Sequence, residues 1–449
     1  MISELLKPEI TELIEQKNWE VLREAVDEWR VPEIAELLME LRPADRTLFF
    51  RLLPRFKMAE VFSYLESDLQ NNLLEELSDE ENRHLLANMA PDDRTMLLGE
   101  LPGVITQRLL NLLNPQDLRE ANKLLGYPEE SVGRLMTPDY IAVRPGWTIG
   151  QSLKHLRAMA KKSETINMIY VTDTSWKMLD ALELKEFILN DPGKKVEEIM
   201  DHTFVSILPT EDREEAVAIM QKYDKTVLPV VDEENVLLGI VTVDDVLDVA
   251  EEEATEDFHK TAAMEPLQRT YRETSVFQLF RKRISWLIIL VFVSLMSSGV
   301  IAAFEDTLEA AIALAFFIPL LIGSAGNAGA QAATIMVRAM ATDDVKIENW
   351  LRTTGKEILV GISLGIAMGI ASYILGIFFG GFTIGIIVGL TMAAIILVAN
   401  IIGTLLPFIL TTFGQDPAVA SSPLIATIMD ASGLLIYFGI ATVFLGAIG

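Results

Sequence analysis

Residues 423–445 read PLIATIMDASGLLIYFGIATVFL, an apolar run that is long enough to cross the roughly 30 Å hydrocarbon core of a membrane as a helix. One carboxylate, Asp430, lies inside this run. An ionised side chain at that depth costs roughly 3 kcal/mol or more unless it faces water, a partner or a cation. Asp430 is therefore either a structural aspartate that is hydrogen-bonded to a neighbouring helix or a carboxylate that lines an ion pathway, and we favour the ion pathway.

The chain has an acidic front and an apolar back. Residues 281–449 carry 7 Lys and Arg against 9 Asp and Glu, whereas residues 1–280 carry 30 against 55, a net charge of −25. An acidic block of this size repels nucleic acid and anionic lipid and attracts cations. With no cysteine and only four histidines, none at a zinc-like spacing, the chain suits oxygen-ligated Mg²⁺ or Ca²⁺ better than zinc, copper or iron. The first residues lack a signal-peptide pattern, so we expect the front to stay in the cytoplasm.

The apolar back predicts a five-helix α transmembrane domain over residues 284–449. Its hydrophobic segments are 284–304, 310–336, 357–379, 384–410 and 423–447. Basic residues precede the first segment (281–283) and recur in the 337–356 loop, whereas the 305–309 and 380–383 loops hold none. Because cytoplasmic loops carry an excess of Lys and Arg, this asymmetry predicts a cytoplasmic N-terminus and a C-terminus on the outside.

Residues 1–130 predict an acidic α-helical N-domain built as a helical repeat. A string that ends P-A-D-R-T at Leu41–Thr47 recurs loosely as P-D-D-R-T within Asn88–Thr95, a separation of 48 residues. Short helices with apolar i, i+3, i+4 spacing and Pro or Asp at the turns stack into solenoids. The region has no nucleophile–base pair and no Gly-rich phosphate loop, so we do not expect an enzyme. The acidic residues of its turns are expected on solvated faces, with weak cation contacts as the alternative: Asp45, Asp68, Asp79, Glu80, Asp92 and Asp93.

Residues 131–258 contain a duplicated α/β module. The segment 133–157 aligns with 197–221 at an offset of 64, and MIYVTD (168–173) aligns with VLPVVD (227–232) at an offset of 59. Each copy predicts a short strand, an amphipathic helix, two hydrophobic strands and a final helix. This pattern resembles a tandem pair of CBS domains, which are usually regulatory.

The second copy carries the candidate nucleotide-binding residues. It ends G-I-V-T-V-D-D at Gly239–Asp245, and the resemblance to CBS domains implies that Thr242 and Asp245 hold the ribose and phosphate of a nucleotide such as ATP. The first copy has Asp180 and Glu183 in place of the glycine and threonine, which argues against a second nucleotide site.

An acidic run follows directly. Residues 244–257 read DDVLDVAEEEATED, with eight carboxylates in fourteen residues. On a helix, Asp245, Asp248 and Glu252 fall on one face, and Glu253, Glu256 and Asp257 fall on an adjoining face. The run is either an exposed acidic helix or a cation sensor, and we favour the sensor because it leads into the membrane domain. Residues 259–283 then predict a connector (plug) helix, with an amphipathic segment over 271–280 near the bilayer surface.

The second span combines small residues with amides. Residues 317–331 read FIPLLIGSAGNAGAQ, in which Asn327 and Gln331 share a helical face. Such a sequence either packs helices closely or lines an ion pathway. A breaker-rich stretch, DPAVASSP at 416–423, leads into the helix that carries Asp430.

Taken in order, the acidic helical N-domain, the CBS pair, EEEATEDFHK, PLLIGSAGNAGAQ and DPAVASSPLIATIMD resemble the MgtE family of bacterial magnesium channels over essentially the full length. The resemblance implies a homodimer in the inner membrane, surrounded by lipid, that imports Mg²⁺ through one central pore and closes when cytosolic Mg²⁺ bridges its acidic domains. Asp430 would match the pore carboxylate that holds hydrated Mg²⁺, and the implied pore lining is Asn327, Gln331, Ser422 and Ala426. The implied cytosolic Mg²⁺ ligands are Asp212, Glu214, Asp224, Asp245, Asp248, Glu253, Glu256 and Asp257.

The sequence departs from the family pattern at one position, and two alternative functions remain open. Ala330 stands where some members of the family carry a second asparagine, so the polar ring of the pore is expected to be smaller here. The alternative functions are a transporter of another divalent cation such as Co²⁺ or Mn²⁺, and a membrane-anchored CBS sensor that does not conduct.

Overall fold

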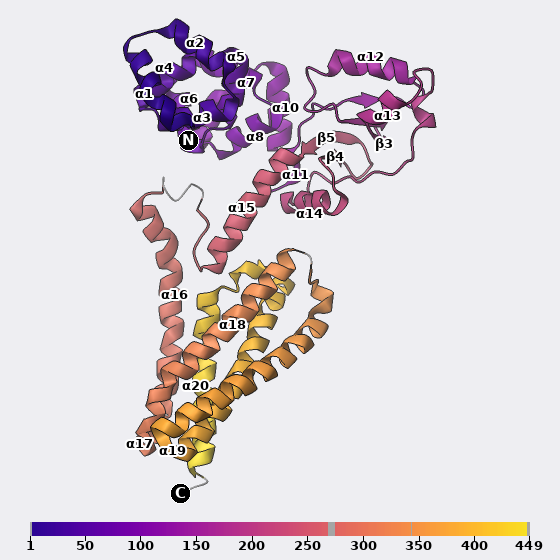
Figure 1. Cartoon of the computed structure of the whole chain (residues 1–449). Coiled ribbons are helices and arrows are strands. Elements are labelled where there is room, and N and C mark those ends of the chain that lie inside the picture. Colours follow the sequence, from indigo (N-terminus) through magenta and orange to yellow (C-terminus); the bar gives the residue numbers. More distant parts are fainter. Residues whose placement is uncertain (1, 268–273, 343, 447–449) are drawn as a thin grey trace. The chain divides into compact units, whose positions relative to one another are not determined.

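The computed structural model describes residues 2–267, 274–342 and 344–446 (Figure 1). The chain divides into two compact units, Met1–Ala250 and Glu251–Gly449. The first unit contains the helical N-domain and the CBS pair, and the second contains the membrane helices.

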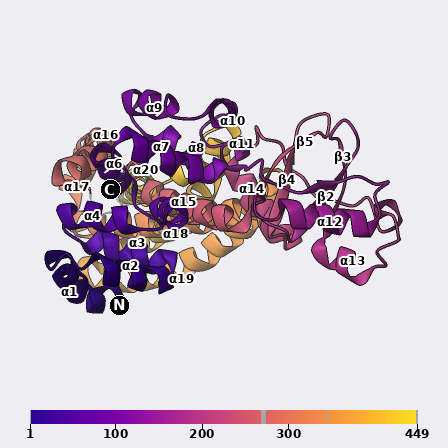
Figure 2. The same ribbon diagram turned by 90° about the horizontal axis from the view of Figure 1, so that it is seen from above.

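The N-domain is a solenoid of short helices that follow one another from α1 (Ile2–Glu15) to α10 (Figure 2). Helices α2 to α10 begin at residues 19, 31, 43, 55, 67, 79, 91, 103 and 115, which are twelve residues apart throughout. Their bounds are α2 Trp19–Glu28, α3 Val31–Glu40, α4 Pro43–Leu52, α5 Arg55–Ser63, α6 Ser67–Glu76, α7 Asp79–Asn88, α8 Pro91–Glu100, α9 Gly103–Leu110 and α10 Pro115–Leu125. The separation of 48 that is visible in the sequence is therefore four units of this repeat.

Two features of each unit explain the period. A buried apolar residue lies one residue after most of the helices, and these residues join one core: Leu41, Leu53, Leu77, Met89 and Leu101. A polar side chain at the fourth helical position then donates to the carbonyl eight residues earlier, near the end of the preceding helix. Examples are Arg46 to Leu38 (2.8 Å), Gln70 to Phe62 (2.9 Å), Asn82 to Leu74 (3.0 Å) and Arg94 to Leu86 (3.1 Å). Because the last carbonyls of a helix lack intrahelical donors, each of these four units caps the one before it.

The CBS pair follows the predicted duplication closely. The first copy contains α11 Val132–Leu135, β1 Ala142–Val143, α12 Ile149–Met159, β2 Met168–Thr172, β3 Met178–Glu183 and α13 Leu184–Leu189. The second contains η1 Val196–Glu198, α14 Arg213–Tyr223, β4 Val227–Val231, β5 Leu237–Thr242 and the start of α15 Val243–Thr261. Helix α14 repeats α12 at the offset of 64, and β4 and β5 repeat β2 and β3 at the offset of 59.

The strands pair in the same way in both copies. Strand β1 is parallel to β2, and β2 is antiparallel to β3. In the second copy β4 is antiparallel to β5, and a single parallel bridge between Ile207 and Val230 takes the place of the β1–β2 pairing. Residues of both copies, including Tyr170 and Ile240, form a shared core, so the two copies pack as a pair.

Helix α15 contains the whole acidic run, which confirms that residues 244–257 are helical. The predicted connector helix over 259–283 is only partly described, because residues 268–273 lie outside the described residues. Residues 276–280 are not a separate helix but the first turns of α16 (Val276–Ala303), which Ser275 caps by accepting from the Gln278 amide at 3.3 Å. Residues 276–280 are thus continuous with the first span, since the helix runs unbroken from Val276 to Ala303.

The second unit contains the membrane helices. After α16 come α17 Glu305–Ala310, η2 Ile312–Phe317, α18 Ile318–Ala341, η3 Ile347–Asn349, α19 Trp350–Thr412, η4 Pro417–Val419 and α20 Ser422–Gly446. Within the described residues, four stretches are long and apolar enough to span a membrane, and the longest is 347–412.

That longest stretch crosses twice. Gly381 has φ 81° and ψ −179°, a conformation open essentially to glycine alone, and it breaks α19 into two halves. The halves fold back on each other so closely that a Cβ atom built on Gly376 would lie 2.6 Å from the Cα atom of Gly385. Within the described part of the chain the apolar helices therefore make five passes, as the sequence predicts.

Candidate functional site

Carboxylates from three parts of the first unit lie near enough for their charges to act on one another. Asp92 and Asp93 come from α8, Glu164 precedes β2, and Asp245 lies near the start of α15. Asp92 is only 7% exposed. We call these four residues the interdomain carboxylate cluster.

The electrostatics of this cluster are unfavourable without a cation. Burial raises the pKa of Asp245 to about 7, opposed by the hydrogen bond from Thr242, and the charges of neighbouring carboxylates add to the rise. Burial also raises the pKa of Asp92 well above its usual range, followed by the charges of Asp245 and Asp93. Burial likewise raises the pKa of Glu164, with neighbouring carboxylates again adding to it. Like charges in a poorly solvated place repel one another, so a bound cation would relieve the cluster.

The sequence prediction was wrong about part of this cluster. Asp92 was expected on a solvated face, but its side chain is buried. Glu164 was not singled out at all. The sequence did contain a signal for Asp92. The equivalent repeat position, 48 residues earlier, is Ala44, so the repeat itself does not need a carboxylate there.

Of the predicted ligands in α15, the structure brings Asp245 and Asp248 to this cluster. Asp248 is exposed, and its charge contributes to the raised pKa of Asp93, for which burial is the largest cause. Glu253 lies further along the same helix and is partly exposed.

Asp212, Glu214 and Asp224 have roles at the ends of α14. Asp212 caps the helix by accepting from the Glu214 amide at 2.9 Å, and it lines a hollow of about 440 Å³ together with Glu129 and Glu130. Asp224 ends the helix in a left-handed conformation with φ 50°. Since eleven residues of helix span about 16 Å, Asp212 and Asp224 are too far apart to bind one ion.

Among the described residues, no three Asp, Glu or His side chains form a ready-made metal cluster.

A second mixed cluster lies in the second unit, and we call it the α15–η4 cluster. Lys260 Nζ contacts Asp416 Oδ2 at 2.5 Å and also pairs with Glu256 one turn earlier. Asp416 uses its other oxygen to cap η4, accepting from the Ala418 amide at 2.7 Å. Burial and then the charge of Asp416 raise the pKa of Asp257, opposed by the positive charge of Lys260.

The predicted pore residues lie on two adjacent helices. Asn327 and Gln331 are both exposed on α18, and Ser422, Ala426 and Asp430 follow at intervals of four along α20. The helices pack tightly here, because a Cβ atom built on Gly326 would lie 3.4 Å from the Cβ atom of Ala426. None of the described residues donates a hydrogen bond to Asp430 or forms an ion pair with it. Its side chain is partly exposed. This weighs against the structural interpretation of Asp430.

The residues that the sequence predicts to bind a nucleotide differ in their contacts between the two CBS copies. Thr242 donates from its hydroxyl to Asp245 Oδ2 at 2.9 Å. In the first copy, Asp180 is fully buried and accepts from the amides of Asp201 and His202 at 2.9 and 3.0 Å. Asp180 is therefore engaged in holding the backbone of residues 201–202.

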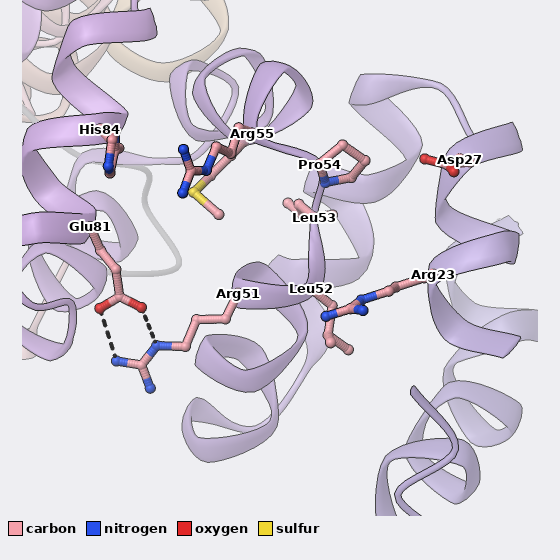
Figure 3. Close-up of a pocket in the computed structure, with 10 residues that line it drawn as sticks. Arg23, Asp27, Arg51, Leu52, Leu53, Pro54, Arg55, Glu81 and His84 are labelled. Carbon is pink, nitrogen blue, oxygen red and sulfur yellow. Dashed lines mark hydrogen bonds and ion pairs between the residues drawn. The ribbon is translucent and has the colours of Figure 1, made fainter. Parts of the chain in front are cut away.

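A hollow of about 450 Å³ in the N-domain has a different character (Figure 3). Its charged lining residues are Arg23, Asp27, Arg51, Arg55, Glu81 and His84. Arg51 Nε donates to Glu81 Oε1 at 2.9 Å. Guanidinium groups repel metal cations, so we exclude this hollow from the candidate cation sites.

Models of protein families match three stretches of the chain. A model described as a divalent cation transporter (MgtE) matches residues 318–440, and one described as the MgtE intracellular N domain matches residues 29–130. A CBS domain model matches residues 196–252, which is the second copy of the duplication.

Individual proteins are similar over the full chain. The magnesium transporter MgtE of Thermus thermophilus is 39% identical over 451 residues, covering 100% of both chains. The magnesium transporter MgtE of Bacillus subtilis is 32% identical over 429 residues, covering 93% of this chain and 95% of the relative. Among solved structures, the cytosolic domain of the Mg²⁺ channel MgtE in complex with ATP covers 54% of this chain and 100% of its own, with 39% identity and a TM-score of 0.53. The soluble part of a magnesium transporter covers 56% and 99%, with 27% identity and a TM-score of 0.53.

Proposed function

Because the chain belongs to the MgtE family of magnesium transporters, we propose that it is a Mg²⁺-selective channel that imports magnesium and is closed by cytosolic Mg²⁺. The observation that carries the proposal is the environment of Asp430. The carboxylate lies within the apolar helix α20, is partly exposed, and receives no hydrogen bond from any described residue. Without such a partner, a carboxylate in a membrane helix is stable only if water or a cation reaches it.

The pore is completed by a second copy of the chain. Asn327 and Gln331 are exposed on the membrane helix α18 of the single chain, where contact with lipid would leave their amides without partners. A homodimer whose axis runs along α18 and α20 places two Asp430 carboxylates around one aqueous path. Mg²⁺ dehydrates reluctantly, so two carboxylates can hold the hydrated ion without stripping its water shell.

Closure by Mg²⁺ follows from differential binding. The interdomain carboxylate cluster is strained by its own charge, since burial and like charges raise the pKa values of Asp92, Asp93 and Asp245. Mg²⁺ favours the arrangement in which these groups are close, and its loss favours their separation. Asp248, Glu256, Asp257 and the residues at the ends of α14 supply further weak sites, whose joint occupation makes the response steep.

The orientation and the nucleotide are parts of the same proposal. The N-terminus is cytoplasmic and the C-terminus is outside, in the inner membrane, because Lys and Arg are concentrated in the 281–283 and 337–356 segments. ATP binds the second CBS copy through Thr242 and Asp245. Thr242→Val should weaken ATP binding to the full chain, and unchanged binding would exclude this site.

Mg²⁺ influx into proteoliposomes tests the main proposal. Flux is measured with low and then millimolar Mg²⁺ on the side that bears the acidic domains. The wild type should conduct and then close, and Asp430→Asn should lose most of the flux. Asp306→Asn is the matched control, because Asp306 is an exposed aspartate of α17.

Each failure of this experiment has a separate meaning. Flux that ignores Mg²⁺ on that side would keep the channel and reject closure by Mg²⁺. No flux in the wild type, or full flux in Asp430→Asn, would favour the non-conducting CBS sensor. Stronger transport of Co²⁺ or Mn²⁺ in competition with Mg²⁺ would favour the alternative substrate.

A further inference from the structure

A lysine occupies the centre of the α15–η4 cluster. Lys260 Nζ lies 2.5 Å from Asp416 Oδ2 and pairs with Glu256, and only a quarter of its side chain is exposed. The two partners come from distant parts of the chain, since Lys260 and Asp416 are separated by 156 residues. The ammonium group therefore joins the end of the acidic helix to the segment that leads into α20.

The environment of Lys260 is built for a cation. Burial alone would lower its pKa, but hydrogen bonds and the charges of Asp416 and Glu256 outweigh burial, so its pKa is raised above the usual value. Asp257 and Arg338 complete the surroundings, because the charges of Lys260, Arg338, Asp416 and Glu256 all act on the Asp257 carboxyl. Two carboxylates thus contact the ammonium, and a third, Asp257, lies within range of its charge and of the charge of the Arg338 guanidinium.

The segment held by Lys260 is packed against the membrane helices. Asp416 caps η4, and Ala418 of η4 is buried with Val337 at the end of α18 and with Ala420. Fourteen residues after Asp416 the chain reaches Asp430. A change in the partner of Asp416 therefore acts on a packed segment that leads directly into the helix carrying Asp430.

An ammonium and a magnesium ion cannot share these oxygens. Mg²⁺ needs oxygen ligands at about 2.0–2.1 Å or a complete shell of water, and the position between Glu256 and Asp416 is filled by Lys260 Nζ. Two positive ions at that spacing would also repel each other strongly. Binding of one at these carboxylates excludes the other.

We propose that Lys260 is a tethered counter-cation that Mg²⁺ must displace from Glu256 and Asp416, so that this lysine sets the Mg²⁺ concentration at which the channel closes. The proposal rests on the proposed function, since it assumes that Mg²⁺ at these carboxylates favours closure. Lys260 is a positioning residue: in low Mg²⁺ its ammonium group neutralises Glu256 and Asp416 and occupies the place between them that the ion would take. Its displacement is the step at which the ion gains these carboxylates as ligands.

The test is the Mg²⁺ dependence of flux through the full chain in proteoliposomes. Lys260→Met removes the charge but keeps the length, so Mg²⁺ no longer competes with an ammonium. The concentration for half-closure should fall about 5-fold or more, the lower range of measured couplings between ligands. Lys260→Arg keeps a cation and should stay near the wild type. Lys185→Met is the control, because Lys185 forms only an exposed pair with Glu183 among the described residues.

A second measurement keeps the proposal testable if flux is lost. Titration of the detergent-solubilised full chain with MgCl₂ should show tighter binding in Lys260→Met, and in Lys260→Gln if the methionine variant does not fold. An unchanged or raised half-closing concentration, or unchanged affinity, would overturn the proposal. A wild type that conducts but does not respond to Mg²⁺ would instead reject the proposed closure, so the two failures are distinguishable.

Discussion

Replacing Asp245 with asparagine isolates the cost of the interdomain carboxylate cluster. The pKa of Asp245 is raised from 3.8 to about 7, mainly by burial. At roughly 1.4 kcal/mol per pKa unit, the ionised carboxylate destabilises the folded unit by up to about 4 kcal/mol. Asparagine keeps an oxygen that accepts the Thr242 hydroxyl, so only the charge is removed.

The sign of the pH dependence follows from linkage. The folded-state pKa lies above the unfolded one, so the folded protein binds more protons between about pH 4 and pH 7. The wild type therefore loses stability as pH rises through this window, and the loss is complete above about pH 7. Asp245→Asn should lose less over the same window and should be the more stable protein at about pH 8 without Mg²⁺.

Thermal unfolding of the full chain in detergent, followed by circular dichroism, measures this difference. A unit of about 250 residues shifts by roughly 2–4 °C per kcal/mol, so about 16 °C is the upper limit of the expected rise. Mg²⁺ should raise the midpoint of the wild type more than that of the variant, because the variant has lost one ligand. Asp191→Asn is the control: Asp191 is exposed and accepts from the Gly193 amide, as asparagine also can. Equal midpoints for the wild type and Asp245→Asn at about pH 8 would refute the reasoning.

Two further predictions concern the fold. Arg94→Met should cost about 3–5 kcal/mol, because it leaves Glu120 and a helix end without their buried partner, whereas Arg46→Met at the equivalent, more exposed repeat position should cost about 1 kcal/mol. Denaturant titration measures the free energy of unfolding of both variants. Equal losses of stability would contradict the difference in burial between the two repeat positions. Gly381→Ala should cost about 1–3 kcal/mol because its φ is 81°, while Gly355→Ala, with open space around it, should be neutral or stabilising. The yield of monodisperse protein after heating compares these variants, and a tolerant Gly381 would disprove the hairpin at that residue.

The sequence predicted the helices and strands whose formation depends on residues close together in the chain. The offsets of 64 and 59 matched α12 with α14 and β2 and β3 with β4 and β5, because hydrophobic periodicity depends on neighbours within a few residues. The five passes, including the turn at 380–383, followed from the length of apolar runs. The twelve-residue period was also present in the sequence, in apolar residues such as Leu41, Leu53 and Leu77, although only its fourfold multiple was recognised.

The tertiary structure alone decided which charges meet. Asp92 looked like any acidic turn residue until the packing of the N-domain against the CBS pair buried it near Asp245. Lys260 looked like an ordinary basic residue after an acidic run until folding placed it against Asp416. Local propensity fixes a helix through contacts of three or four residues, but the free energy of a charge depends on every group within several ångströms, wherever it lies in the chain. The helices could therefore be read from the sequence, whereas the partners of the charged side chains could not.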